Sequence, residues 1–268
     1  MQFIGYIAAV LIGISLGLIG GGGSILTVPL LVYIFHLPPA AAVSYSLFIV
    51  GITSLIGAFN NFRKKQASLN LALPLGIVSP ATVFFVRRDV VPHIPEQLWI
   101  IGKLEVTKST LTMLLFAVLM LAAAVSMLKR ATAPSTKAAG VRSMKDYFQL
   151  GLFGLGIGCV TGFLGAGGGF LIIPALVLLM KLPMKEAVGT SLFIIGINSL
   201  IGFTGDLGHY TIDWIFLWYI TAIASAGILI GTQLAKKIPS EKLKRGFGWF
   251  VLVMGMYIIV QEVMILWG

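Results

Sequence analysis

Two glycine-rich stretches, GLIGGGGSILTVP (Gly17–Pro29) and GFLGAGGGFLIIP (Gly162–Pro174), decide how this 268-residue chain folds. Each glycine destabilises a helix by about 1 kcal/mol relative to alanine, so a run of them is expected to interrupt one. The residue before a proline is pushed toward extended geometry, and proline suits the first turn of a new helix. We therefore predict a glycine-broken or re-entrant helix in each stretch, with Pro29 and Pro174 in the first turn after the break.

The two stretches belong to an internal repeat. When the sequence is shifted by 145 residues, Ser15–Gly57 aligns with Val160–Gly202 without a gap, and 22 of the 43 aligned residues are identical. Identity of this strength indicates a duplication, and each copy contains five apolar segments. We expect one transmembrane domain over residues 1–268, divided into a first repeat at 1–128, a linker at 129–146 and a second repeat at 147–268.

The composition of the chain is that of a membrane protein. Hydrophobic residues make up 58% of it and charged residues only 10%, whereas a soluble domain carries about 25% charged residues. Uncharged runs such as Leu111–Leu128 and Trp214–Leu234 have the length of about 20 residues that a spanning helix needs. The expected fold class is an all-α integral membrane protein, located in the inner (cytoplasmic) membrane of the cell.

The basic residues predict how each repeat is oriented. Lys and Arg in short loops are retained on the cytoplasmic side, and the threading that follows this rule places 15 of the 19 basic residues there, including those of the linker. This explains the net charge of +10 without a nucleic-acid partner. The loop after Arg63 is then inside, whereas its equivalent around Asp206 and His209 is outside. We therefore expect inverted-topology repeats, which are typical of secondary transporters with a site between the two copies.

Candidate substrate-binding residues lie in the glycine breaks and on the third apolar segment of each copy. Non-helical backbone at membrane depth must be buried in protein or line a wet path, and its amides can bind an anion. Close helix packing is the alternative role of the glycines. Matched hydroxyl and amide residues on the third segments either line a solute path or join helices by hydrogen bonds. The candidates are Gly20, Gly21, Gly22, Gly23, Ser24, Gly165, Ala166, Gly167, Gly168, Gly169, Ser46, Thr53, Ser191 and Asn198.

The remaining polar residues have ordinary expected roles. Arg63 and Arg87 are expected to be anchors at the ends of spans, with a contribution to neutralising an anion near the mouths of the path as the alternative. Asp206, His209 and Asp213 are expected in a solvated loop, with proton coupling as the alternative. The sequence contains no H-E-x-x-H motif, no P-loop and no paired carboxylates within a span. These absences argue against an enzyme, a metal site, a cofactor and an ATP-driven pump.

With these residues identified, the chain resembles the TauE/SafE sulfite exporter family. The pattern G-x-x-G-x-G-G occurs at Gly17–Gly23 and again at Gly162–Gly168, each followed by proline six residues later, and the runs SLFI and GI-x-SLIG also occur twice. The pair Ser79-Pro80 departs from the expected glycine-rich pattern. The resemblance implies export of a small sulfur-containing anion, such as sulfite or an organosulfonate.

The expected mechanism is alternating access of the two inverted copies. The coupling ion is left open between proton and sodium. A passive anion channel of the same fold is the runner-up, and an intramembrane enzyme is a weaker alternative.

Overall fold

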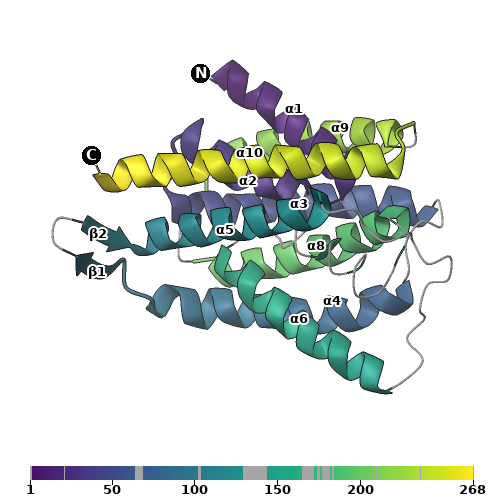
Figure 1. Ribbon diagram of the computed structural model, residues 1–268, viewed down its shortest axis with the longest axis horizontal. Helices are drawn as coiled ribbons and strands as arrows, with labels where there is room; N and C mark the ends of the chain where they lie inside the picture. The colour runs from purple at the N-terminus through teal and green to yellow at the C-terminus, as the bar shows by residue number, and fades with distance from the viewer. Residues whose placement is uncertain are drawn as a thin grey trace.

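The architecture is a bundle of helices that run mostly along its long axis, with a small two-stranded hairpin at one end (Figure 1). A computed structural model of the chain describes residues 2–20, 22–63, 69–101, 104–128, 144–164, 172–173, 176, 182, 184–208, 211–235 and 237–267. The second glycine stretch therefore falls largely outside the described residues, as does the linker.

Five helices of the first half follow the predicted apolar segments closely. They are α1 (Gln2–Ile19), α2 (Gly22–Tyr33), α3 (Pro39–Arg63), α4 (Leu69–Phe85) and α5 (Lys108–Leu128). In the second half the described helices are α6 (Met144–Leu164), α8 (Met184–Asp206), α9 (Trp214–Leu234) and α10 (Ser240–Trp267). The all-α membrane fold is confirmed.

The connection between α4 and α5 contains structure that the sequence did not predict. After α4 the chain forms a π-helical turn, η1 (Val86–Val90), and a short 3-10 turn, η2 (Val91–His93). It then forms an antiparallel hairpin of β1 (Gln97–Ile101) and β2 (Leu104–Thr107). This small sheet caps one end of an otherwise helical molecule (Figure 1).

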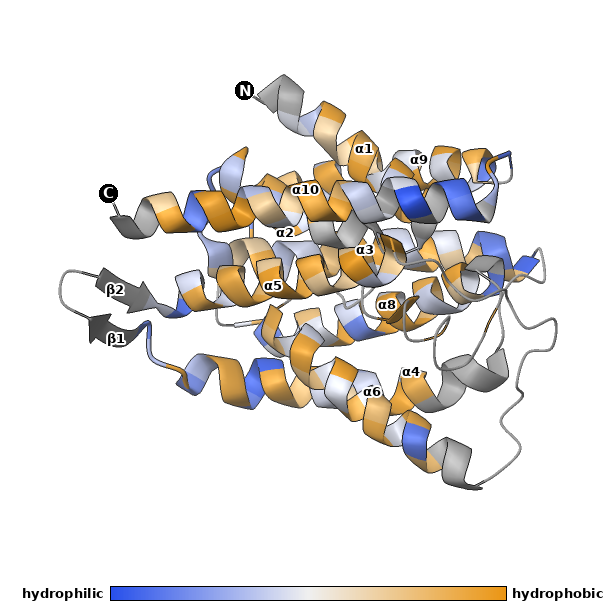
Figure 2. Cartoon of the chain, in the orientation of Figure 1, coloured by the Kyte–Doolittle hydropathy of each residue, from blue (hydrophilic) through white to orange (hydrophobic). Residues whose placement is uncertain are grey.

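The surface of the bundle is suited to lipid. Four described helices are long and apolar enough to cross a membrane: Pro39–Arg63, Thr110–Leu128, Glu186–Asp206 and Trp214–Leu234. Apolar residues dominate the helices, while hydrophilic ones gather near helix ends (Figure 2). Large apolar side chains point outward, and both Phe148 and Ile215 are 73% exposed. Water would disfavour such a surface, whereas hydrocarbon would solvate it.

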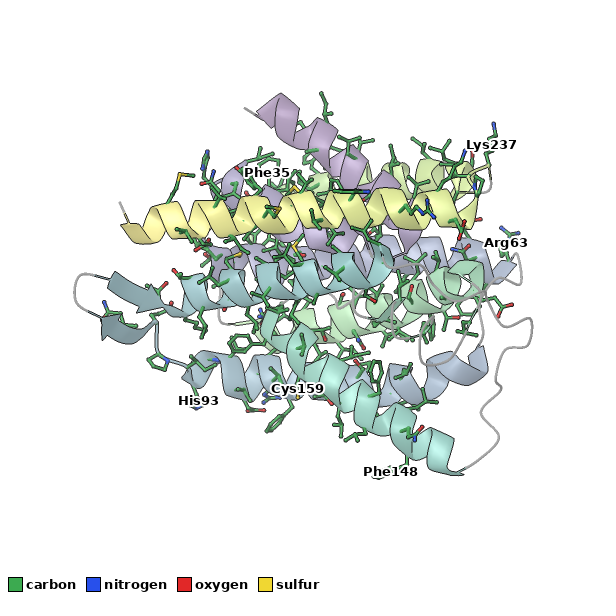
Figure 3. All side chains as sticks on the ribbon, in the orientation of Figure 1. Phe35, Arg63, His93, Phe148, Cys159 and Lys237 are labelled. Atoms are coloured by element: carbon green, nitrogen blue, oxygen red, sulfur yellow. The ribbon has the colours of Figure 1, made fainter. Side chains whose placement is uncertain are left out.

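Residues that were predicted to share a side of the membrane lie at the same end of the bundle. Arg63 and Lys237, both expected in the cytoplasm, lie at the same end (Figure 3). His93 belongs to the loop expected outside, and it lies at the opposite end (Figure 3).

The two halves pack on each other in a reciprocal way. Helix α1 packs against α9, and the repeat-equivalent of this pair is α6 against α4, which also pack. Likewise α3 packs against α9, and α8 packs against α4. Two further pairs, α3 with α8 and α5 with α10, join a helix to its own equivalent. This pattern is what a pseudo-twofold axis between the repeats produces.

The crossing of α3 and α8 shows the reciprocity at the level of residues. A Cβ added to Gly51 would lie 2.7 Å from the Leu200 side chain, and one added to Gly196 would lie 2.6 Å from the Leu55 side chain. These four residues form two repeat-equivalent pairs, since position 51 corresponds to 196 and 55 to 200. From Gly51 to Leu55 the residue number rises along α3, while the contacted residue on α8 falls from Leu200 to Gly196. The two helices therefore run antiparallel. Inversion of the repeats across the bilayer stays a prediction, and this crossing supports it.

Backbone contact between α1 and α9 requires glycine, which predicts a destabilising substitution. A Cβ on Gly231 would lie 2.3 Å from the Ile14 carbonyl oxygen, which cannot move without shifting the helix. Gly231→Ala should therefore lower the free energy of unfolding by about 1–3 kcal/mol. The control is Gly76→Ala in α4, where nothing lies within 4 Å and alanine should add about 0.5–1 kcal/mol. Thermal unfolding of both variants in detergent checks the prediction, and an equal response would contradict it.

Candidate functional site

The first glycine stretch does break the helix, and the break is at Gly20. Helix α1 ends at Ile19, and Gly20 has φ +79°, a left-handed conformation that glycine adopts at no steric cost. Its N–H donates to the Leu16 carbonyl at 2.7 Å, which closes the end of α1. Helix α2 begins two residues later, at Gly22. With 12 residues, α2 is about 18 Å long and too short to cross a core of about 30 Å.

The predicted position of Pro29 was wrong. The proline lies well inside α2, whose first turn is formed by Gly22, Gly23 and Ser24 instead. The amides of a first turn have no acceptor within the helix, so glycine costs least there. Pro29 removes only the one N–H that would bond to the Ile25 carbonyl. The prediction placed the start of the second helix at Pro29, about two turns after its actual start at Gly22. It gave the proline more weight than the glycine that adopts the left-handed conformation.

The break lies directly against the second repeat. Gly20 is buried, and a Cβ built on it would be 2.8 Å from Val188 Cγ1, 3.0 Å from the Val188 carbonyl oxygen and 3.1 Å from Ser191 Oγ. Two candidates predicted from different copies, Gly20 and Ser191, are therefore neighbours. The absence of a side chain at position 20 is what allows the backbone of the break to approach α8.

The four predicted polar residues of the third segments are all buried. Thr53 and Ser191 turn their hydroxyls toward their own helices: Thr53 Oγ1 donates to the Ile49 carbonyl at 2.6 Å, and Ser191 Oγ donates to the Val188 carbonyl at 2.9 Å. Asn198 Nδ2 donates instead across the helices, to Ser79 Oγ at 2.7 Å. Ser79 is the residue at which the sequence departs from the family pattern, and it joins α4 to α8.

Several buried polar atoms on α3 and α8 have no hydrogen-bond partner among the described residues. They are Ser44 Oγ, Ser46 Oγ, Ser54 Oγ, Asn198 Oδ1 and Ser199 Oγ. An unpaired buried polar atom costs about 1–3 kcal/mol, and such atoms are rare in native proteins. All five lie on the two helices that cross at the pseudo-twofold axis. Polar solutes or water along these two helices would satisfy them, and we call them the unpaired polar set.

Some of the predicted residues cannot be placed in this arrangement. Gly21, Gly165, Ala166, Gly167, Gly168 and Gly169 lie outside the described residues, and Gly22, Gly23 and Ser24 are described only as the start of α2. Of the predicted set, the structure therefore brings Gly20 next to Ser191, and places Ser46, Thr53 and Asn198 in the buried interior.

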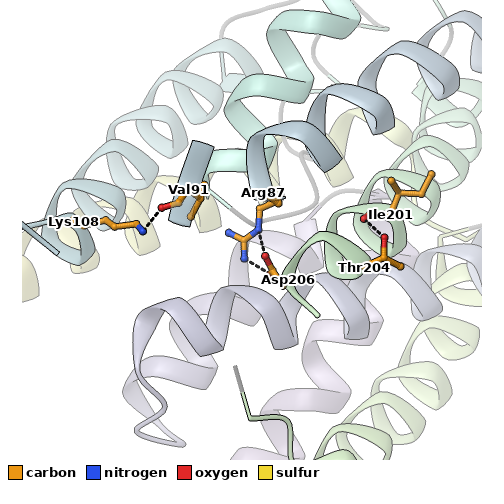
Figure 4. Close-up of polar contacts among 6 residues, drawn as sticks. All are labelled: Arg87, Val91, Lys108, Ile201, Thr204 and Asp206. Carbon is orange, nitrogen blue, oxygen red and sulfur yellow. Dashed lines mark hydrogen bonds and ion pairs between the residues drawn. The ribbon is translucent and has the colours of Figure 1, made fainter. Parts of the chain in front are cut away.

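Arg87 and Asp206 form a buried ion pair that contradicts their predicted roles (Figure 4). Arg87 Nε donates to Asp206 Oδ1 at 2.7 Å, and Nη2 donates to Oδ2. Each side chain is only 3% exposed, so Arg87 is not an anchor at the surface and Asp206 is not in a solvated loop. The unpredicted π-helical turn η1 prolongs α4 and brings Arg87 onto α8. Asp213, by contrast, caps α9 by accepting a hydrogen bond from the Phe216 N–H at 3.0 Å.

A second buried carboxyl group escaped the sequence reasoning. Glu262 on α10 is 6% exposed, and Tyr33 at the end of α2 donates its hydroxyl to Glu262 Oε1 at 3.2 Å. The ring of Tyr257 stands edge-on to Tyr33. Within the described ranges no basic group pairs with Glu262, and no three His, Cys, Asp or Glu side chains gather closely enough to hold a metal ion.

Comparison with known proteins covers almost the whole chain. The sequence profile described as sulfite exporter TauE/SafE matches residues 5–258. A probable membrane transporter protein of Xylella fastidiosa (strain 9a5c) is 30% identical over 253 residues, which cover 93% of this chain and 91% of the relative. A probable membrane transporter protein of Methanocaldococcus jannaschii is 28% identical over 269 residues, with coverage of 95% and 94%. Another, from Bacillus subtilis, is 25% identical over 237 residues, with coverage of 87% and 90%. The resemblance seen in the paired glycine stretches is thereby confirmed, and the chain belongs to the sulfite exporter TauE/SafE family of membrane transporters.

Proposed function

We propose that this protein is a secondary transporter that moves a small sulfur-containing anion, sulfite or an organosulfonate, out of the cell across the cytoplasmic membrane. The observation that supports the proposal is the unpaired polar set on α3 and α8, because α8 also packs against the break at Gly20. Polar atoms without partners destabilise a dry interior, so their concentration on one pair of helices favours a path that a polar solute occupies in turn.

The chemistry of this region suits an oxyanion. Serine hydroxyls and the Asn198 amide can donate hydrogen bonds to oxygen atoms. Helix α2 begins at Gly22, immediately after Gly20, so the positive end of its dipole and its free first-turn amides lie next to the break. Gly20 itself touches Ser191, which ties the start of α2 to the polar face of α8. An anion held here would be neutralised by dipoles.

The reciprocal packing supports a mechanism of alternating access. The flank α1–α9 and the flank α4–α6 each combine one helix from each repeat, and the pseudo-twofold axis exchanges them. In a second conformation, each flank would take up the position relative to α3 and α8 that the other flank has now. The site would then open to the other side of the membrane. The proposed movement is a rocking of these flanks about that crossing.

Flux measurements in liposomes test the proposal. The purified full-length chain should transport sulfite or methanesulfonate with saturation, and an excess of unlabelled anion on the far side should accelerate exchange. Imposed pH and sodium gradients identify the coupling ion and the direction that each gradient drives. Unsaturable conductance would support the channel alternative, and absence of flux for every sulfur anion would overturn both readings.

A further inference from the structure

The Arg87–Asp206 ion pair is more expensive than its place in the fold requires. Burying two charges costs several kcal/mol per ion, which their attraction repays only in part. The repeat-equivalents of Arg87 and Asp206 are Thr232 and Asn61, and both are neutral. There the residue next to Asn61, Asn60, donates through Nδ2 to Thr232 Oγ1 at 2.9 Å and joins α3 to α9. Since position 87 corresponds to 232, a neutral hydrogen bond is sufficient to join these helices. The charges therefore need another explanation.

The geometry of the pair is that of a bound oxyanion. Arg87 presents two N–H groups side by side to the two oxygens of Asp206, which is the arrangement in which guanidinium binds carboxylate, phosphate and similar anions. Sulfite and sulfonates offer comparable oxygen pairs on one central atom. Arg87 Nη1 makes no hydrogen bond to any of the described residues, so the guanidinium has unused donors. Gly205 allows α8 to approach the η1 turn closely, because a Cβ there would lie 3.1 Å from Arg87 Cβ.

We propose that Arg87 is an anion-binding residue whose guanidinium is occupied by Asp206 in this state, and that a sulfite or sulfonate anion displaces Asp206, which then takes up a proton. This inference rests on the proposed function and names the ligand, the side chain and the coupling ion. The anion meets Arg87 on the side of the membrane where the η1 turn and the hairpin lie (Figure 1).

Proton uptake follows from the burial of Asp206. A carboxylate that is 3% exposed and loses its guanidinium partner cannot stay ionised without a large desolvation cost. One proton from solution neutralises it, and Arg87 remains protonated throughout. For a singly charged anion, the complex then gains one negative and one positive charge. The empty and loaded states then carry the same net charge, and one proton moves in the same direction as each anion. Export of the anion down its own concentration gradient therefore carries a proton out with it.

Among the residues that the structure describes, few other charged groups face this pair. Arg88 and Asp89 on η1 are exposed, and α4 contains no charged residue. The charged residues of α6 lie in its first turn, and the charged residue of α3, Arg63, is the last residue of that helix. Lys108, which precedes the α5 span, donates through Nζ to the Val91 carbonyl (Figure 4). It also donates to the Ile94 carbonyl. Burial lowers the pKa of Lys108, Glu96 opposes that shift and the charge of Arg87 adds to it. Asp206 is thus the carboxyl group through which binding here would depend on pH.

The experiment measures binding of methanesulfonate to the purified full-length protein between pH 5 and 8 by calorimetry, together with flux in liposomes. Methanesulfonate stays ionised across this range, so any pH dependence comes from the protein. Wild-type binding should strengthen as pH falls, because the proton that Asp206 needs becomes available. Asp206→Asn should bind at least about tenfold more tightly at pH 8 and lose the pH dependence, a change of about 1.4 kcal/mol.

Three further variants keep the test decisive. Arg87→Lys keeps the charge but loses the two-pronged geometry, and should weaken binding about tenfold or more. The neutral pair Arg87→Gln with Asp206→Asn avoids an unpaired buried charge and should not bind. Thr232→Val, at the repeat-equivalent of position 87, should keep the wild-type pH profile. Wild-type pH dependence in Asp206→Asn, or wild-type affinity in the neutral pair, would overturn the inference while leaving the proposed function intact. Absence of wild-type binding and flux would instead defeat both.

Discussion

Gly20→Val is expected to eliminate anion flux in liposomes while the protein still inserts and folds. The substitution places a β-branched residue at φ +79°, which costs about 1–3 kcal/mol of backbone strain. It also drives a Cβ toward the Val188 carbonyl and the Ser191 hydroxyl, which lie 3.0 and 3.1 Å away. The start of α2 would be pushed off α8, separating the break from the polar face. Flux of sulfite per inserted molecule is the measurement.

Gly208→Val provides a matched control for this prediction. Gly208 also has a left-handed φ, of +93°, so valine meets the same kind of backbone strain. Nothing lies within 4 Å of a Cβ at that position, so no contact is disturbed. Both variants should lose stability through backbone strain, and Gly20→Val should lose more because of its clash with α8, but only Gly20→Val should lose transport. Equal flux from the two would remove the break from the site.

Ser54→Ala and its repeat-equivalent, Ser199→Ala, are expected to make the protein more stable and less active. Both hydroxyls are fully buried and lack a partner among the described residues. Removing such an atom relieves its desolvation cost, so the free energy of unfolding should rise by about 1 kcal/mol or more. If a solute uses these hydroxyls, the same change removes a donor from its path. The double variant should therefore show a higher unfolding temperature and a several-fold higher KM for sulfite.

The control for the serine variants is Thr221→Val on α9. Its hydroxyl is equally buried but is satisfied, because Oγ1 donates to the Leu217 carbonyl at 2.7 Å. Valine has nearly the same shape, so it should leave both flux and KM unchanged and give no gain in stability. A loss of stability in the serine variants with unchanged KM would show that those hydroxyls serve packing alone.

Local chemistry explains which parts of the fold were predictable. Apolar runs of spanning length define helices because lipid leaves few other options, and the described helix bounds follow them within a few residues. The break in the first copy was predictable because glycine adopts the left-handed backbone angle found at Gly20 without steric cost. The repeat alignment placed Ser46 and Ser191 on matched helices before any contact was known.

Tertiary contacts explain what escaped prediction. The partnership of Arg87 and Asp206 joins residues 119 positions apart, and it depends on a π-helical turn that has no clear signature in the sequence. The aligned positions Asn61 and Thr232 are polar in the other copy, which is the one signal that could have singled the pair out. The pairing of Tyr33 with Glu262 likewise brings together distant helix ends.

The meeting of Gly51 with Leu200, and of Gly196 with Leu55, has a consequence for the ancestry of the chain. Here the same surface of both copies is in contact, as in the interface of a symmetric homodimer. A half-length ancestor would therefore have assembled from two identical subunits inserted in opposite directions. Fusion of the genes then freed each side to diverge. Among descendants, residues 51 and 200 should vary together, as should 55 and 196, while one end of the molecule acquired a charge pair that the other never needed.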